Sequence, residues 1–152
     1  MRRVYIVGIL VAILLFLVIS AMLARVFSAN GAEQSAITSL VQSEAGGDVN
    51  AILGEIQGCR TDPACRTRAA VNAAALKHPG TISIIQLQPS TSFSLGGTQG
   101  TARVAWNAAS YRYPIVQCVK VRRAGNPISG LSVELLEVSR RIKSDTACPA
   151  HY

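Results

Sequence analysis

An uninterrupted apolar run stands near the start of the chain. From Val4 to Leu23, twenty consecutive residues carry no charged side chain. Because a helix rises about 1.5 Å per residue, this run spans roughly 30 Å, the thickness of the hydrocarbon core of a bilayer. The pattern predicts a transmembrane helix over residues 4–24, preceded by a short cytoplasmic segment, residues 1–3.

Two other interpretations of this run were weighed. A cleaved signal peptide would share the basic start, Arg2 and Arg3, but its apolar region is usually about 7–15 residues long. The small-residue cleavage pattern after the run is also poor, and only Val26-Phe27-Ser28 is passable. A helix buried in a soluble core would have to hide apolar side chains on every side within a small domain. We therefore favour a retained anchor, with cleavage as the alternative.

The flanking charges predict the orientation of the anchor. Arg2 and Arg3 precede the run, whereas Arg25 alone follows it closely and the next basic residue is Arg60. Cytoplasmic flanks carry the excess of Lys and Arg, so the N-terminus is expected in the cytoplasm. The chain is thus predicted to be a single-pass protein of the cell membrane with an extracytoplasmic C-terminal domain.

Apolar residues with a helical period follow a predicted linker over residues 25–32, where Asn30-Gly31 can turn the chain. The next segment, residues 33–45, is predicted to be helical because three of its apolar residues fall at i, i+3 and i+4. These residues are Ile37, Leu40 and Val41.

Two further helices are predicted from their capping residues. Asp48 is a suitable N-cap for the first, and Gly58 stands where a C-terminal cap belongs. Asp62-Pro63 supplies an N-cap and a proline at the first helical position for the second, which runs toward Pro79. The first of these helices has the clearest amphipathic pattern in the chain, formed by Val49, Ile52, Leu53 and Ile56.

After Pro79-Gly80 the apolar period changes from helical to alternating. Residues 81–88 are predicted to form a strand of ambiguous register, because Ile82 and Ile84 lie on one face and Ile85 and Leu87 on the other. Phe93 and Leu95 alternate with serines before a glycine-rich turn. The next strand covers residues 101–107, with Ala102, Val104 and Trp106 on one face.

Two more strands complete the alternating region. Residues 113–123 place Tyr113, Ile115, Val119 and Val121 on one face, and Cys118, Lys120 and Arg122 on the other. In residues 131–138, Leu136 and Val138 fall out of phase with Leu131, Val133 and Leu135, which predicts a bulge near Leu135-Leu136.

Helices followed by antiparallel strands predict an α+β class. We expect one N-terminal transmembrane helix, then two or three helices packed on a curved antiparallel sheet of four or five strands. The residues beyond the apolar run suffice for one domain with a core but not for two. That domain is predicted over residues 33–143, with a C-terminal tail at 144–152.

The chain contains four cysteines, Cys59, Cys65, Cys118 and Cys148, and all follow the apolar run. This distribution fits an oxidising compartment, and the spacing favours Cys59 with Cys65 and Cys118 with Cys148 among the three possible connectivities. Because Cys118 is predicted to face outward, Cys148 can reach it only if the tail folds back across the outer side of the sheet. Four buried thiols or a zinc site are the alternatives, but C-x5-C is not a zinc spacing.

The net charge is +7, and much of it lies in the last third of the chain. This surplus predicts a possible contact surface for anionic lipid headgroups, acidic cell-wall polymers or nucleic acid, and the expected partner is an envelope protein or an anionic surface. An ordinary solvated face is the alternative, and no interleaved aromatic run suggests nucleic acid. The basic residues are Arg112, Lys120, Arg122, Arg123, Arg140, Arg141 and Lys143.

The helix that opens at Gly47-Asp48 and carries Ile52 and Leu53, followed by another helix and antiparallel strands, resembles the nuclear transport factor two-like (cystatin-like) superfamily. The resemblance covers about residues 33–142. It implies a cone-shaped α+β domain, and membrane-anchored bacterial members carry one N-terminal span. The chain departs from those members in lacking a tryptophan on its final hairpin, since its only tryptophan is Trp106.

No catalytic motif is present in the sequence. His78 is interpreted as a helix-end residue and His151 as a tail residue, and the Asp and His pair of catalytic superfamily members cannot be matched. We therefore predict a non-enzymatic chain without cofactor or metal. The favoured function is an interaction module of the bacterial cell envelope. The alternatives are a small-molecule or lipid-binding cone and a minor pilin-like subunit, although the run lacks the acidic residue and Gly-Phe junction of prepilins.

Overall fold

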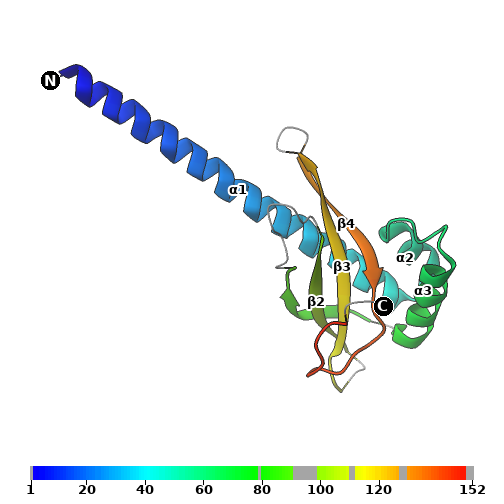
Figure 1. Ribbon diagram of the computed structural model, residues 1–152. Helices are drawn as coiled ribbons and strands as arrows, with labels where there is room; N and C mark the ends of the chain where they lie inside the picture. The colour runs from blue at the N-terminus through cyan, green and yellow to red at the C-terminus, as the bar shows by residue number, and fades with distance from the viewer. Residues whose placement is uncertain (1, 79, 91–98, 110–111, 127–129, 150–152) are drawn as a thin grey trace.

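The computed structural model places three helices before a four-stranded antiparallel sheet, which confirms the α+β class (Figure 1). The structure describes residues 2–78, 80–90, 99–109, 112–126 and 130–149, and for residues 2–5, 22–29, 124–126 and 130–131 it describes the backbone alone. The elements are α1 (Arg2–Gly46), α2 (Val49–Glu55), α3 (Pro63–Leu76), β1 (Ile82–Gln88), β2 (Gln99–Ala108), β3 (Ile115–Asn126) and β4 (Gly130–Val138).

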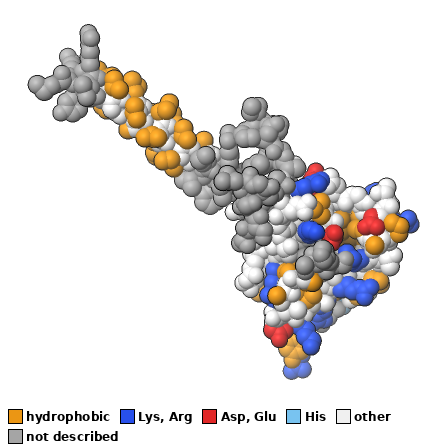
Figure 2. Space-filling view, in the orientation of Figure 1, with side chains coloured by type: hydrophobic (Ala, Val, Ile, Leu, Met, Phe, Trp, Pro, Cys, Tyr) orange, Lys and Arg blue, Asp and Glu red, His pale blue; other side chains and the backbone are white. Residues whose placement is uncertain are grey.

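Helix α1 has two different environments along its 45 residues. Its N-terminal part projects away from the rest of the chain, and its C-terminal part packs on the sheet (Figure 1). Every large apolar side chain from Ile6 to Ile19 is at least 50 % exposed, and Figure 2 shows them as the apolar surface of the projecting helix. Within the described residues, no helix is long and apolar enough to cross a membrane.

The predicted linker over residues 25–32 is not a break in the helix. Instead, α1 continues through Asn30 and Gly31 to Gly46. Glycine costs about 1 kcal/mol relative to alanine inside a helix, and asparagine costs less. A helix that is already formed on both sides of such residues propagates through them, because only nucleation is costly. The turn expected from Asn30-Gly31 was therefore wrong.

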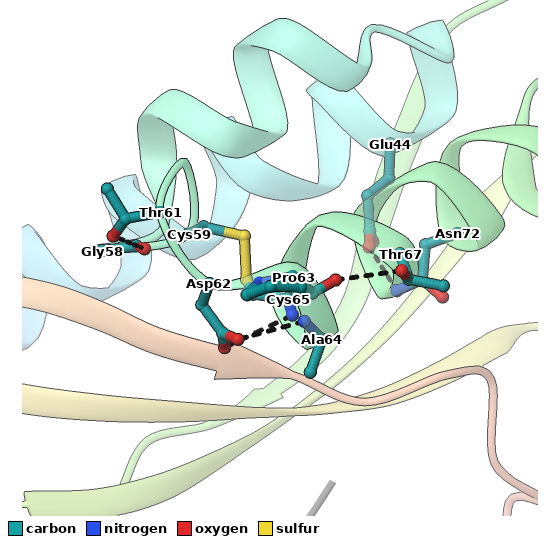
Figure 3. Close-up of a disulfide and its surroundings, with 10 residues drawn as sticks. All are labelled: Glu44, Gly58, Cys59, Thr61, Asp62, Pro63, Ala64, Cys65, Thr67 and Asn72. Carbon is teal, nitrogen blue, oxygen red and sulfur yellow. Dashed lines mark hydrogen bonds between the residues drawn. A yellow bond between two sulfur atoms is a disulfide. The ribbon is translucent and has the colours of Figure 1, made fainter.

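Both predicted N-caps are confirmed. The Asp48 carboxylate accepts a hydrogen bond from the backbone N–H of Ala51 at 3.0 Å, and that of Asp62 accepts from Ala64 and Cys65 at 3.0 and 3.3 Å (Figure 3). These bonds satisfy amide groups that the first helical turn leaves without partners.

The end of α2 differs from the prediction. The helix ends at Glu55, before Gly58, which lies instead in the following turn with φ of 72°. Ile56 leaves the helix to form a parallel bridge with Leu135 on β4, and the amide of Gln57 donates to the Leu135 carbonyl at 2.7 Å. Pairing with the edge of the sheet thus replaces the glycine cap.

The strands follow one another in the order β1-β2-β3-β4. The predicted bulge in β4 is confirmed, because Lys120 pairs with Glu137 while Val121 pairs with Leu135, which leaves Leu136 as the extra residue. A second irregularity in β1 resolves its ambiguous register: Ile82, Ile84 and Leu87 pack on the core, whereas Ile85 is 58 % exposed. Phe93 and Leu95 lie outside the described residues.

The core lies between the inner face of the sheet and the helices. Trp106, Ile115 and Leu135 fill the sheet side and belong to the same buried cluster as the stripe of α1 that was predicted from its period. The predicted inner face of β3 is confirmed except at Tyr113, which is 67 % exposed. Pro114 has no N–H to give to a strand ladder, so β3 begins after it, at Ile115.

Both predicted disulfides are confirmed. Cys59 is bonded to Cys65 (Figure 3), and Cys118 is bonded to Cys148, with Cα–Cα distances of 5.2 and 5.7 Å. From here on, the tail is the described segment that follows β4, residues 139–149, and its last part returns across the outer face of the sheet as predicted. The amide of Ile142 first donates to the carbonyl of Val116 at 2.8 Å, on the side of β3 where β4 pairs, and Arg103 of β2 then donates to the carbonyl of Ser144. Cys118 is consequently buried beneath the tail.

Candidate functional site

A polar network crosses the core between the end of α1 and the sheet. The carboxylate of Glu44, which is 0 % exposed, accepts hydrogen bonds from Asn72 Nδ2 and Gln117 Nε2, both at 2.8 Å. Gln117 Oε1 accepts from Trp106 Nε1 at 2.8 Å. The carbonyl of Ser139 accepts from the same two amide groups at 3.1 and 3.3 Å. The network therefore joins α1, α3, two strands and the start of the tail.

The described hydrogen-bond donors to the Glu44 carboxyl group are neutral amides, not cations. Burial raises the pKa of Glu44 from 4.5 to about 7, against the opposing effect of the hydrogen bonds from Gln117 and Asn72. Because Trp106 donates to the Gln117 oxygen, the Gln117 amide must turn its N–H groups toward Glu44. This carboxyl changes its protonation near neutral pH, but its complete burial keeps it from meeting a substrate. We assign it a role in holding the elements together.

A second buried carboxylate lies on the same helix. Glu33 is 0 % exposed and accepts hydrogen bonds from the amide and hydroxyl groups of Ser90 at 2.8 and 3.2 Å. It also forms an ion pair with Arg123 on β3 at 3.1 Å, and Arg123 donates to Asn30 Oδ1 at 2.8 Å. This pair fastens the middle of α1 to the sheet.

The predicted basic contact surface is divided by the fold. Arg123 is turned inward to Glu33, and Arg122 pairs with Glu134 on the neighbouring strand and contacts Gln57. Lys120 is half-buried on β3. The other four residues are exposed. Arg112 precedes β3, and Arg140, Arg141 and Lys143 lie on the tail. The seven residues therefore do not form one patch.

Two surface hollows flank the tail and share Ile142 as a wall. One, of about 350 Å³, is lined by Arg68 of α3 and by Ser139, Arg140, Ile142 and Pro149. The other, of about 630 Å³, is lined by Tyr113, Pro114, Arg141, Ile142, Lys143, Ser144 and Asp145. The exposed basic residues of the tail thus stand beside apolar walls, and Arg68 joins them from a helix.

A third hollow, of about 710 Å³, lies where α1 meets the segment after α3 and is lined in part by Gln42, Lys77 and His78. The amide of His78 donates to the carbonyl of Ala45 at 2.8 Å, which places this histidine beside the end of α1. His151 lies outside the described residues. In the described part of the chain, no group of three or more His, Cys, Asp or Glu side chains is placed to bind a metal ion.

The chain matches no protein-family model, and neither the curated proteins nor the solved structures contain a match. The resemblance to the nuclear transport factor two-like superfamily therefore stays a prediction.

Sequence reasoning missed the buried polar roles of Glu33, Glu44, Gln117 and Asn72. Glu33 and Glu44 extend the apolar stripe of α1 by one helical period at each end, so their spacing was a usable signal. Gln117 stands between inner-face residues of β3 and gave a similar signal. For Asn72 and Arg68, in the alanine-rich α3, the sequence gave no usable signal. Their roles depend on which face of α3 meets the sheet and the tail.

Proposed function

We propose that this chain is a single-pass, membrane-anchored interaction module without catalytic activity, whose disulfide-bonded domain lies outside the cytoplasm. The apolar, exposed N-terminal part of α1 is the observation that carries the proposal. Its large apolar side chains from Ile6 to Ile19 are each at least 50 % exposed, and they lie around the whole helix because successive residues point about 100° apart. A contiguous apolar surface of this extent is rarely left to water, and a bilayer would cover it.

The disulfides support an extracytoplasmic location, because such bonds persist in oxidising compartments. The filled core supports an interaction role over a small-molecule or lipid-binding cone. Trp106, Ile115 and Val119 fill the inner side of the sheet with 0 % exposure, whereas a ligand site there needs an open concave pocket. A membrane anchor would also suit a minor pilin-like structural subunit, which stays an alternative function.

A topology experiment tests the anchor. Protease added to intact spheroplasts should digest the domain and spare a tag at the N-terminus, and carbonate washing should leave the chain in the membrane. Replacing Leu14 and Leu15 by arginine should release it, because each arginine costs roughly 2.5–3.5 kcal/mol at the centre of a spanning helix. The matched control, two lysines at Gln42 and Gly46 on the exposed side of α1, should stay inserted. A protected domain or a released wild-type chain would refute the proposal.

A partner experiment tests the interaction role. Chemical crosslinking in the native membrane, followed by mass spectrometry, should recover the same partner from repeated preparations. A tethered domain is concentrated at the membrane, so weak contacts suffice for function. Turnover of a small molecule by the purified chain would contradict the non-catalytic assignment.

A further inference from the structure

The tail and α3 form a continuous surface at one end of the domain. We call it the tail surface and define it by Arg68, Tyr113, Arg140, Ile142, Lys143 and Pro149. Ile142 separates the two hollows, and each hollow combines apolar walls with basic side chains at its rim. An extended chain laid across Ile142 would enter both hollows.

The tail surface carries more basic than acidic side chains. Arg68, Arg140 and Lys143 form no ion pair with the residues that the structure describes. Asp145 is the acidic residue that lines these hollows. Arg122 and Arg123, by contrast, are engaged by Glu134 and Glu33. Two of the basic residues of β3 are therefore paired within the domain, whereas Arg68, Arg140 and Lys143 remain available to a partner.

The tail is held firmly in place before any partner arrives. The Cys118–Cys148 disulfide fixes its far end, and the Ile142 amide bonds to the Val116 carbonyl at 2.8 Å. The amide of Ser139 donates to the Cys118 carbonyl at 2.8 Å, and its hydroxyl accepts from the Cys118 amide at 2.9 Å. A surface fixed in this way loses little entropy when it binds, which favours affinity.

The position of the tail surface disfavours the lipid of the anchoring membrane as its partner. Ser139, beside the first hollow, is joined through Asn72 to Glu44 near the end of α1. If the bilayer ends at about Leu23, a helix near the membrane normal places Glu44 roughly 30 Å farther out. Electrostatic attraction is screened over about 8 Å at physiological ionic strength. Figure 1 shows the tail on the side of the domain away from the projecting helix.

We propose that the tail surface binds an acidic, leucine- or phenylalanine-containing segment of another protein. This inference rests on the proposed interaction role. Arginine guanidinium groups donate paired hydrogen bonds to carboxylates, and the apolar walls formed by Ile142, Pro149 and Tyr113 accept apolar side chains. A polyphosphate or a sulfated polymer would use the charge alone and leave those walls uncovered.

The test uses the full chain in nanodiscs and two libraries of labelled short peptides. One library combines Asp and Glu with Leu and Phe, and the other replaces the acids by Asn and Gln. The acidic library should bind with measurable fluorescence anisotropy, and the neutral one should not. The double variant Arg68→Glu, Arg140→Glu should weaken binding about a hundredfold, since each of the two lost charge-assisted contacts is worth about tenfold. The matched control, Arg60→Glu with Arg66→Glu, should bind as the wild type does.

Three results would overturn the inference. They are no binding by the acidic library, equal loss in both double variants, and equally tight binding of polyphosphate or of vesicles rich in phosphatidylglycerol. An Ile142→Ser variant keeps the charge and tests the apolar part, and unchanged affinity there would also count against the proposal. The emission of Trp106 verifies that each variant is folded. If crosslinking in the membrane finds partners through another face, the interaction role stands while the tail surface fails.

Discussion

Glu33 and Glu44 lie on the same face of one helix and are both 0 % exposed, yet they are stabilised differently. Glu33 has a cation, Arg123, at 3.1 Å, together with two hydrogen bonds from Ser90. Among the described residues, the donors to Glu44 are neutral amides, those of Asn72 and Gln117. The chain therefore contains a buried ion pair and a buried lone carboxyl within one domain.

The difference shows that neutral amide donors do not replace a cation beside a buried carboxylate. Two hydrogen bonds at 2.8 Å lower the pKa of Glu44, but burial outweighs them and the pKa still rises to about 7. At Glu33 the guanidinium of Arg123 supplies the opposite charge that a desolvated carboxylate requires. We expect the Glu33 end of α1 to depend on its charge partner and the Glu44 end to depend on pH.

The largest effect should come from breaking the ion pair. Arg123→Met leaves the buried Glu33 charge without a cation, so the free energy of unfolding should fall by about 3–5 kcal/mol. The double variant with Glu33→Leu should lose less than the sum of the two single changes. Urea unfolding of the full chain in detergent, followed by Trp106 fluorescence, measures this. Additive losses would mean that the two side chains do not interact.

The next effect is the pH dependence carried by Glu44. Its pKa is higher in the folded chain than the ordinary 4.5, so the folded state holds the proton more tightly and stability falls as pH rises from about 4.5 to 7. The decline from this group should reach about 3 kcal/mol. Glu44→Gln should remove that decline, whereas the exposed control Asp145→Asn should retain it. The same slope in Glu44→Gln would assign the effect to another group.

A smaller effect tests the amide donors themselves. Asn72→Ala deprives Glu44 and the Ser139 carbonyl of one donor, and leaving buried acceptors unsatisfied costs about 1–3 kcal/mol. Because that hydrogen bond lowers the pKa of Glu44, its loss should also move the decline to higher pH. Asn50→Ala, on the exposed side of α2, serves as the control. A loss of stability without any change in the pH profile would mean that Asn72 stabilises the fold by packing and does not act on the Glu44 carboxyl group.

The smallest effect comes from an exposed carboxylate. Asp48 caps α2 through the Ala51 amide, and Asp48→Ala should cost about 1 kcal/mol. Asp48→Asn should retain most of that stability, because asparagine is an equally good cap. Thermal unfolding of the three chains in parallel measures the difference. A loss as large as that of Arg123→Met would mean that burial is not what distinguishes Glu33.

Sequence reasoning was sufficient where local chemistry decides the structure. The caps at Asp48 and Asp62, the bulge at Leu136 and the fold-back that brings Cys148 to Cys118 all follow from residue type and period. It was insufficient where tertiary packing decides. The turn at Asn30-Gly31 was overridden by the helix on both sides, and Ile56 left its helix for the edge of β4. Arg123 is turned inward by Glu33 and Arg122 contacts Gln57, and both of these partners lie far from the arginines in the chain.

Because α1 is one continuous helix, the rotation of the domain about the helix axis is fixed relative to the N-terminal part of α1. Each residue in a helix turns the chain by about 100° and advances it by about 1.5 Å. Deleting one residue within 25–32 would swing the tail surface about a quarter-turn around the helix axis. Inserting seven residues adds about two full turns, so the tail surface would face nearly its original direction and lie about 10 Å farther along the helix axis. Under the proposed membrane anchoring, the length of that segment would therefore set which side of the domain a partner in the same membrane meets.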